Sequence, residues 1–261
     1  MDIASLRMSI FVTVLLTCAL AEYFKPRRKL SQSKPVRWAN NLGLTGLNSL
    51  LIYLTMPLLA IEAAMWAHQQ QIGLFNQLAI APLIAIIACV LILDCVIYWQ
   101  HRLFHSMPLL WRLHKVHHAD QDIDVTTGAR FHPIEIGLSM VIKIAVTVSL
   151  GIPVIAIIVF EIMLNASAMF NHSNIRLPSK IDALIRRIIV TPDMHRVHHS
   201  TIRSETDSNY GFFLSTWDHL FNSYQAQPKL GHKSMHIGIS QFRRPQEQRI
   251  DKMLTQPFRN Q

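Results

Sequence analysis

Residues 94–118 read DCVIYWQHRLFHSMPLLWRLHKVHH, in which two groups of histidines follow an apolar run. A third group lies about eighty residues later and repeats the H-x2-H-H spacing of the second. On a helix, residues three and four apart share a face, so each group presents its imidazoles in one direction. Imidazole is a common ligand of zinc, iron, copper and nickel. The pattern predicts a metal site formed by His101, His105, His114, His117, His118, His195, His198 and His199.

The composition predicts a membrane protein. Of the 261 residues, 50% are hydrophobic and 16% are charged, whereas about a quarter of the residues in a soluble domain are charged. Apolar runs near the roughly 20 residues needed to cross hydrocarbon cover 8–24, 42–67 and 78–100. A longer run over 134–170 is interrupted at Gly151-Ile152-Pro153, where a tight turn is expected. We therefore expect five membrane segments, or three spans and a re-entrant hairpin.

The loops between these runs indicate their orientation. Residues 25–37 hold six Lys and Arg, whereas residues 67–77 hold none, so the positive-inside rule places the former in the cytosol. The three histidine groups then lie on the cytosolic side. The same rule and contact with anionic lipid explain the net charge of +9, and no motif indicates nucleic-acid binding. The predicted fold is an all-α, polytopic membrane bundle whose cytosolic helical cap, residues 101–133 and 171–261, holds the histidines.

Four further residues are candidates for roles around the metal. Asp94 is an acid inside an apolar run, seven residues before His101; it is expected either to hold the His101 imidazole or to pair with another span. His132 is a metal ligand, a residue that orients a ligand, or a helix cap. Asn209 and Tyr210 belong to a turn expected to close over the site. We take Asp94, His132, Asn209 and Tyr210 as candidate catalytic residues.

Other polar residues are given local interpretations. Lys143 and Glu161, inside the 134–170 run, either pair with each other or line a wet cavity. Thr191-Pro192-Asp193 predicts a helix start. His232 and His236 are interpreted as surface residues.

His172 follows the 134–170 run and is a ninth candidate ligand. Eight or nine imidazoles exceed the four ligands of a structural zinc, so two ions are expected. A dimetal hydrolase usually has bridging carboxylates. A site beside the bilayer can instead receive a lipid chain, and oxidation of an unactivated C–H bond favours iron with dioxygen.

The combined pattern from about residue 90 to 225 resembles the fatty acid hydroxylase superfamily, which includes sterol desaturases, sterol methyl oxidases and alkylglycerol monooxygenases. The resemblance rests on D-x3-Y-x2-H-R-x2-H from Asp94, the two H-x2-H-H groups, Asn209-Tyr210-Gly211 and Trp217-Asp218. It implies a membrane di-iron oxygenase that uses dioxygen and external electrons to hydroxylate or desaturate a sterol, fatty acyl chain or ether lipid. It assigns ligand roles to the eight histidines above and to His172.

The electron donor is expected to be a separate protein, such as an acidic carrier that docks on the basic face. Two other functions stay open: a membrane metallohydrolase acting on lipids, and a non-enzymatic metal-binding membrane protein such as a transporter or sensor.

Overall fold

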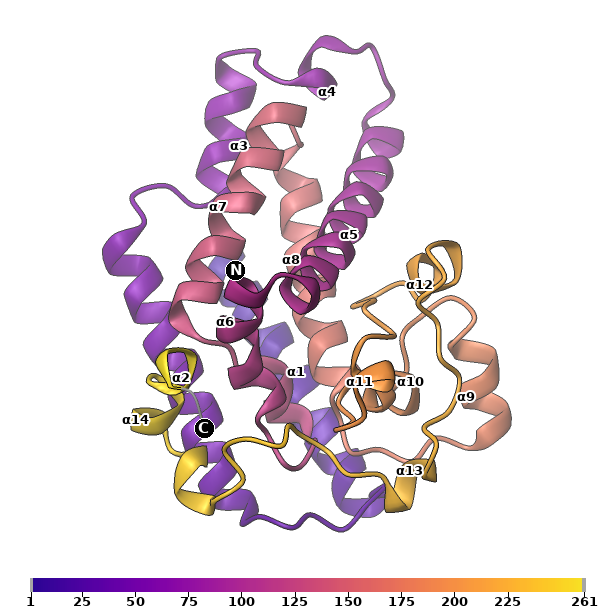
Figure 1. The fold of residues 1–261 in the computed structure, drawn as a ribbon. Helices are drawn as coiled ribbons and strands as arrows, with labels where there is room; N and C mark the ends of the chain where they lie inside the picture. Colours follow the sequence, from indigo (N-terminus) through magenta and orange to yellow (C-terminus); the bar gives the residue numbers. More distant parts are fainter. Residues whose placement is uncertain (1, 260–261) are drawn as a thin grey trace.

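A computed structural model describes residues 2–259, and this part of the chain is helical, with no β-strand. The long helices form an upright bundle; most of the shorter helices gather at one end of it, and α3 and α4 lie at the other end (Figure 1). The long helices are α1 (Ile3–Phe24), α2 (Lys34–Thr55), α5 (Pro82–Ser106), α7 (Pro133–Leu150) and α8 (Val154–Asn171). The all-α fold predicted from the sequence is confirmed.

Five segments of the described chain are long and apolar enough to cross a membrane. They correspond to the five long helices, with the second segment continuing beyond α2 to Gln77. The α1 helix turns many large apolar side chains outward, among them Met8, Leu16 and Leu20, each about 60% exposed. Such a surface is unfavourable in water and suited to lipid. The fold is a polytopic membrane helical bundle.

The second apolar run is not one helix. It was expected over 42–67, but α2 ends at Thr55 and α3 (Ala60–Gln69) follows after a break that contains Pro57. Proline cannot donate the helical hydrogen bond and disfavours helical backbone in the residue before it, so it ends α2 here. The short helix α4 (Leu74–Gln77) then connects to α5.

The hairpin of α7 and α8 turns at Gly151, as expected. Gly151 has a left-handed backbone, φ 66°, which glycine adopts at low cost. A Cβ on the facing Gly73 would lie 2.1 Å from the Gly151 nitrogen, so the loop before α4 presses directly on this turn. Behind it, α5 and α8 pack through Cys89, Leu93 and Phe160 in a buried apolar core.

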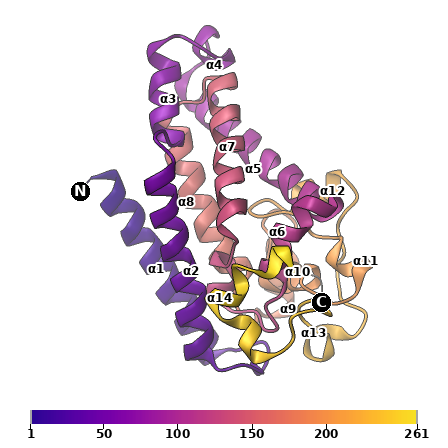
Figure 2. The ribbon, with the colours of Figure 1, turned by 60° about the vertical axis from the view of Figure 1, so that its left-hand side comes forward.

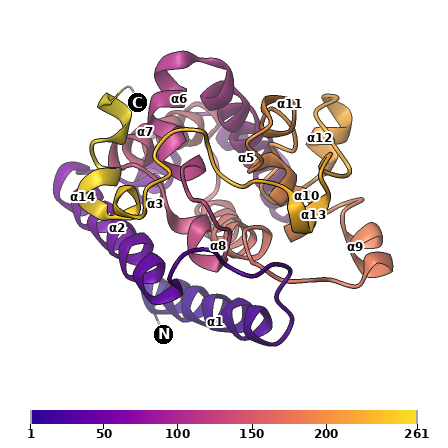
Figure 3. The ribbon, with the colours of Figure 1, turned by 60° about the horizontal axis from the view of Figure 1, so that its bottom comes forward.

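The predicted cap began at residue 101, but α5 continues to Ser106; the part outside the long helices, residues 107–132 and 172–259, is called the cap from here on and covers one end of the bundle (Figure 2). It contains α6 (Pro108–His118), η1 (Val125–Ala129), α9 (Ser179–Ile185), α10 (Pro192–His198), α11 (Arg203–Thr206), α12 (Thr216–Leu220), α13 (Gly231–Ser234), η2 (Pro245–Gln248), α14 (Ile250–Met253) and η3 (Gln256–Phe258). Figure 3, from below, shows the C-terminal segment crossing the cap from α13 to α14, which packs beside α2.

A buried ion pair network joins the bundle to the cap. Arg37 on α2 binds Asp120 (Nη2 to Oδ2, 2.7 Å) and Asp124, and it also donates to Thr127. All three partners belong to the connection between α6 and η1 or to η1 itself. Because each charge in this network has a partner, its burial is tolerated, and the histidine-bearing α6 is held against the bundle.

Candidate metal centre

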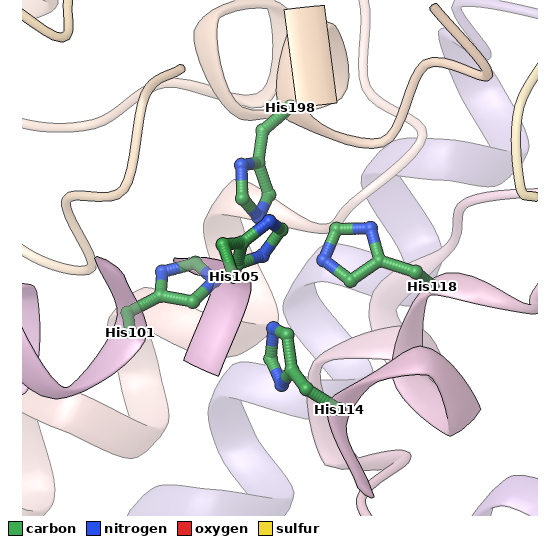
Figure 4. Close-up of side chains that lie close together, drawn as sticks. All are labelled: His101, His105, His114, His118 and His198. Carbon is green, nitrogen blue, oxygen red and sulfur yellow. The ribbon is translucent and has the colours of Figure 1, made fainter. Parts of the chain in front are cut away.

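Nine histidines from four parts of the chain meet where the bundle joins the cap. Within each of two groups, one ring nitrogen from every member lies within 4.8 Å of the others, and all nine side chains are buried. The first group, whose rings converge in Figure 4, is His101, His105, His114, His118 and His198. The second group is His117, His172, His195 and His199.

Helical spacing explains how the residues divide. The i, i+4 pairs stay together: His101 with His105 and His114 with His118 in the first group, and His195 with His199 in the second. The histidine inside each H-x2-H-H motif goes to the other group, because it points from a different side of its helix. His117 and His198 therefore cross over and connect the groups. The rings of His118 and His199, one from each group, stack with centroids 4.5 Å apart.

Two helix boundaries bring these pairs together. Pro108 begins α6 just after α5 ends at Ser106, and this corner brings the ring centroids of His105 and His114 to 5.0 Å from each other. Thr191 caps α10, its side chain accepting a hydrogen bond from the Met194 amide, with Pro192 in the first turn. The predicted helix start at Thr191 is confirmed.

Backbone carbonyls fix the orientation of four rings. The Nδ1 atoms of His101 and His198 lie 2.7 Å from the carbonyl oxygens of Tyr210 and Ser208. The Nδ1 atoms of His117 and His172 lie 3.2 and 2.6 Å from the carbonyls of Arg130 and Ala168. A carbonyl only accepts, so each Nδ1 carries the proton and each Nε2 presents a lone pair.

Two carboxylates face further rings. Glu135 on α7 accepts from His114, with Oε1 to Nδ1 at 2.6 Å. Asp207 lies at a longer distance, 3.5 Å, from Nδ1 of His105. A carboxylate that accepts from a ligand imidazole fixes its tautomer and increases its basicity, as is usual around protein metal sites.

The inward nitrogens fit a metal centre. The Nε2 atoms of His101, His105, His114, His118, His198 and His199 are buried and have no hydrogen-bond partner among the described residues. In the second group, Nε2 of His172 lies 3.1 Å from Nε2 of His117 and 3.0 Å from Nε2 of His195. Because Nδ1 carries the proton in both His117 and His172, the lone pairs of their two Nε2 atoms face each other. Shared cations would satisfy these groups, whose burial is otherwise costly.

Burial also keeps the rings neutral. It lowers the pKa of His114 to about 3 and that of His172 to about 4. Burial and the neighbouring imidazoles hold the pKa values of His118, His195 and His199 well below the ordinary value. A neutral imidazole is the form that binds a metal, so both groups are prepared for ligation at neutral pH.

A cavity of about 340 Å3 reaches the first group from between the long helices. His101 and His114 line it together with Phe104, Phe131 and Phe212. Its wall also includes apolar side chains of α2, α5, α7 and α8, namely Ile52, Ile97, Met140 and Leu164. The lining is mostly apolar, which suits a lipid chain.

The expected pairing of Asp94 with His101 is wrong. Asp94 Oδ2 accepts from the Trp217 indole at 2.7 Å and from the Leu214 amide at 3.2 Å. These donors lie about 120 residues later in the chain, Leu214 in the loop that leads to α12 and Trp217 in α12 itself. Asp94 therefore fastens this loop to α5, and the Tyr210 carbonyl orients His101 instead.

His132 is a helix cap. Its Nδ1 accepts from the Ile134 amide at the start of α7, and its Nε2 lies 3.3 Å from the Leu254 carbonyl. It belongs to neither histidine group. Of the three roles open to it from sequence, the structure supports the local one.

Asn209 and Tyr210 lie beside the site; Asn209 acts through its side chain and Tyr210 mainly through its backbone. Asn209 has a left-handed backbone, φ 52°, and its side chain bonds Met194 and Gln225. The Tyr210 amide donates to Asp218, its carbonyl orients His101, and its ring lies 5.3 Å from that of His105. Both residues hold the loop that orients the first group.

Two other interpretations are resolved. His232 was expected at the surface, but its side chain is only 5% exposed, because the C-terminal segment folds back over α10. Its Nε2 lies 3.7 Å from Oδ2 of Asp193. His236 is exposed, as expected. Lys143 and Glu161 pair, with Nζ to Oε1 at 2.7 Å, and both line the cavity.

Glu135 is not among the residues predicted from the sequence. It is an acid at the start of an apolar run, the same signal that singled out Asp94, so the signal was present. The other ring partners are backbone carbonyls, which the type of residue does not predict; they belong to Arg130, Ala168, Ser208 and Tyr210.

Comparison with known proteins places these residues in a family. The fatty acid hydroxylase family model matches residues 86–223. The ornithine lipid hydroxylase OlsE of Rhizobium tropici is 29% identical over 144 residues, covering 55% of this chain and 42% of that protein. Human alkylglycerol monooxygenase is 26% identical over 135 residues, covering 50% and 28%. The very-long-chain aldehyde decarbonylase GL1-4 of Oryza sativa is 27% identical over 135 residues, covering 48% and 21%.

The matched part of the chain thus spans less than half the length of each of these relatives. No solved structure matches the chain significantly. The matched region begins within α5 and ends after α12, so it includes all nine histidines, and it covers more than half of the chain. The chain belongs to the fatty acid hydroxylase family.

Proposed function

We propose that this protein is a membrane-bound, non-haem di-iron enzyme that hydroxylates or desaturates a lipid with dioxygen. One observation carries the proposal: the cavity among apolar helices ends at His101 and His114, members of the five-histidine group. A lipid chain in this cavity would meet the metal directly. The names of the three relatives, which refer to an ornithine lipid, alkylglycerols and very-long-chain aldehydes, support a lipid substrate.

The two histidine groups would each hold one iron ion. Bound iron would supply the activation of dioxygen that oxidation of an unactivated C–H bond requires. The chain's own residues keep the imidazoles neutral by burial and fix their tautomers through carbonyls and Glu135. Phe104, Phe131 and Phe212 surround the cavity beside His101 and His114, so they would orient the lipid chain and exclude water from it.

The substrate belongs to one of three lipid classes: a sterol, a fatty acyl chain or an ether lipid. Hydroxylation and desaturation both begin with removal of hydrogen from a carbon. The outcome then depends on how the cavity walls hold the neighbouring carbon.

The histidine site is proposed to face the cytosol. The basic segment between α1 and α2 lies at the cap end of the bundle, where Arg28 donates to the carbonyls of His232 and Met235. By the positive-inside rule this end is cytosolic. A separate electron-transfer protein, expected to be acidic, would then approach the cap from the cytosol.

Two other functions are less well supported. A lipid metallohydrolase usually has carboxylates that bridge its metals, whereas both groups consist of histidine. A metal transporter would place ligands along the membrane segments, whereas these histidines gather at one end. A metal sensor would bind the ions without consuming oxygen.

Metal analysis of the purified protein tests the proposal. We expect about two iron ions per chain in detergent, and a clear loss in His198→Ala and in His117→Ala, one variant from each group. His232→Ala is the matched control, because His232 is buried in the same cap but belongs to neither group. A folded parent that binds no metal would overturn the proposal.

Oxygen uptake distinguishes the proposed oxygenase from a metallohydrolase and from a metal sensor or transporter. With iron and a reductant, the parent should consume oxygen in step with appearance of a hydroxylated or desaturated lipid. Release of lipid acids without oxygen uptake would indicate a hydrolase. Metal binding with neither reaction, across lipids of all three classes, would indicate a sensor or transporter.

A further inference from the structure

A charged cluster lines the same cavity away from the histidines. Arg7 of α1 and Lys143 of α7 both bind Glu161 of α8. The Arg7 Nη2 lies 2.5 Å from Glu161 Oε2, and the Lys143 Nζ lies 2.7 Å from Glu161 Oε1. All three residues line the cavity that reaches His101 and His114. The cluster and the candidate metal centre therefore border the same cavity.

The cluster has an excess of positive charge. Two cations share one carboxylate, which leaves a net charge of +1 among apolar helices, where charged side chains are costly and usually functional. Both oxygens of Glu161 are engaged. A guanidinium carries five N–H donors and an ammonium three, so the contacts with Glu161 leave donors available for another acceptor. The cavity's other carboxylate, Glu135, is engaged by His114.

The cluster lies at a definite distance from the histidines. Glu161 on α8 precedes His172, the C-cap of this helix, by eleven residues, which is about 16 Å at the helical rise of 1.5 Å per residue. Lys143 follows Glu135 by eight residues on α7, which is about 12 Å. Apolar side chains of Ile97 and Met140 line the cavity that contains both ends. The cavity thus has a cationic end, an apolar wall and a histidine end.

We propose that Arg7 and Lys143 bind the oxyanion of the lipid substrate, a carboxylate or a phosphate, while its chain extends along the apolar wall to the histidines. This inference rests on the proposed function and adds the substrate class, an anionic lipid. An extended chain advances about 1.2 Å per bond, so the oxidised carbon would lie roughly ten to thirteen bonds from the anionic group. The cluster would set which carbon reacts.

A purely structural ion pair is the alternative, and the chain contains a matched example. Lys34 pairs with Glu22 at 3.4 Å; its side chain is 38% exposed, like that of Arg7, and Glu22 is buried like Glu161. This pair does not line the cavity. Lys34→Met therefore removes a comparable ion pair without changing the proposed site.

Equilibrium binding in the absence of oxygen and reductant tests the inference on the full chain in detergent. The probes are palmitate and hexadecyl phosphate, each against a neutral counterpart, methyl palmitate and hexadecanol. We expect the parent to bind at least one anionic probe tenfold or more tightly than its neutral counterpart. The anion that binds more tightly identifies the substrate's anionic group as a carboxylate or a phosphate. Lys143→Met should lose this preference yet still bind the neutral probe, Lys143→Arg should keep it, and Lys34→Met should match the parent.

Glu161→Gln changes the affinity for the anionic probes in opposite directions under the two interpretations. Removing the competing carboxylate should strengthen anion binding, whereas loss of a structural ion pair would weaken binding of every probe. Melting temperatures identify variants that fail to fold; if Glu161→Gln is one, the two Lys143 variants decide. Equal binding of anionic and neutral probes by the parent, or equal loss of both in Lys143→Met, would overturn the inference.

The outcomes separate the two proposals. Anion preference in a protein that oxidises no lipid would refute the proposed function and retain the binding site. Lipid oxidation with the same KM in the parent and in Lys143→Met would retain the function and refute the anion site.

Discussion

His114 Nδ1 and Glu135 Oε1 lie 2.6 Å apart, and this contact joins the first helix of the cap to the first residues of α7. Among the nine histidines of the two groups, the others with a close Nδ1 partner face backbone carbonyls. Glu135 is thus the carboxylate that lies closest to a ring of the candidate metal centre. It also lines the cavity, so it connects the ligand set with the substrate space.

Replacing Glu135 by Leu should weaken metal binding by about ten- to a hundredfold, the usual effect of removing a partner of a ligand histidine. The His114 ring would lose the acceptor that fixes its tautomer. Competition with a chelator of known affinity measures the change.

Asp94→Asn is the control for this prediction. Asp94 is also a buried carboxylate in a long helix, but it binds Trp217 and Leu214 and no histidine. We expect metal affinity close to that of the parent, with a lower melting temperature because a buried charge-assisted hydrogen bond is weakened. A larger loss of metal affinity in Asp94→Asn than in Glu135→Leu would contradict our assignment.

The same two acids illustrate what sequence can predict here. Helical spacing is local, so the faces of the H-x2-H-H motifs and the corner at Pro108 were predictable. The partner of Asp94 comes from about 120 residues later, and no spacing within the run specifies it. The division of nine histidines into five and four depends on how α5, α6, α8 and α10 pack. The carbonyl of Tyr210 is a backbone group, which any residue could supply.

Asn209→Ala should destabilise the protein by about 2 kcal/mol or more, since its side chain makes three hydrogen bonds in a buried loop. The variant should also bind metal less tightly, because this loop supplies the carbonyls that orient His101 and His198. Denaturation in detergent measures the first effect. Asn222→Ala is the control: Asn222 has a similar left-handed backbone, φ 55°, but is exposed. Equal destabilisation by both variants would attribute the effect to the backbone alone.

The metal-free protein should lose stability as the pH falls from about 6.5 to about 4. Burial lowers the pKa of His172 from the ordinary 6.5 to about 4, so in this range the unfolded chain binds a proton that the folded chain does not. The free energy of unfolding is therefore greatest above pH 6.5 and falls by about 1.4 kcal/mol per pH unit for this group. Melting temperatures across the range measure the slope. The slope should be shallower in His172→Gln than in the parent, and unchanged in the control His236→Gln, whose side chain is exposed. An equal slope in the parent and both variants would show that His172 does not cause the loss of stability.

Gly128→Ala should release metal preferentially from the second group. A Cβ at Gly128 would lie 2.4 Å from the carbonyl oxygen of Ala168, and that oxygen accepts from Nδ1 of His172 at 2.6 Å. To relieve the clash, η1 and α8 must separate, which displaces the acceptor that orients His172. Overpacking of this kind costs about 1–3 kcal/mol, and iron per chain should fall from about two toward one. Gly46→Ala is the control, because a Cβ there meets nothing within 4 Å, and alanine should stabilise α2 by up to about 1 kcal/mol. Full iron content in Gly128→Ala would show that the Ala168 carbonyl is not needed to hold His172 in place.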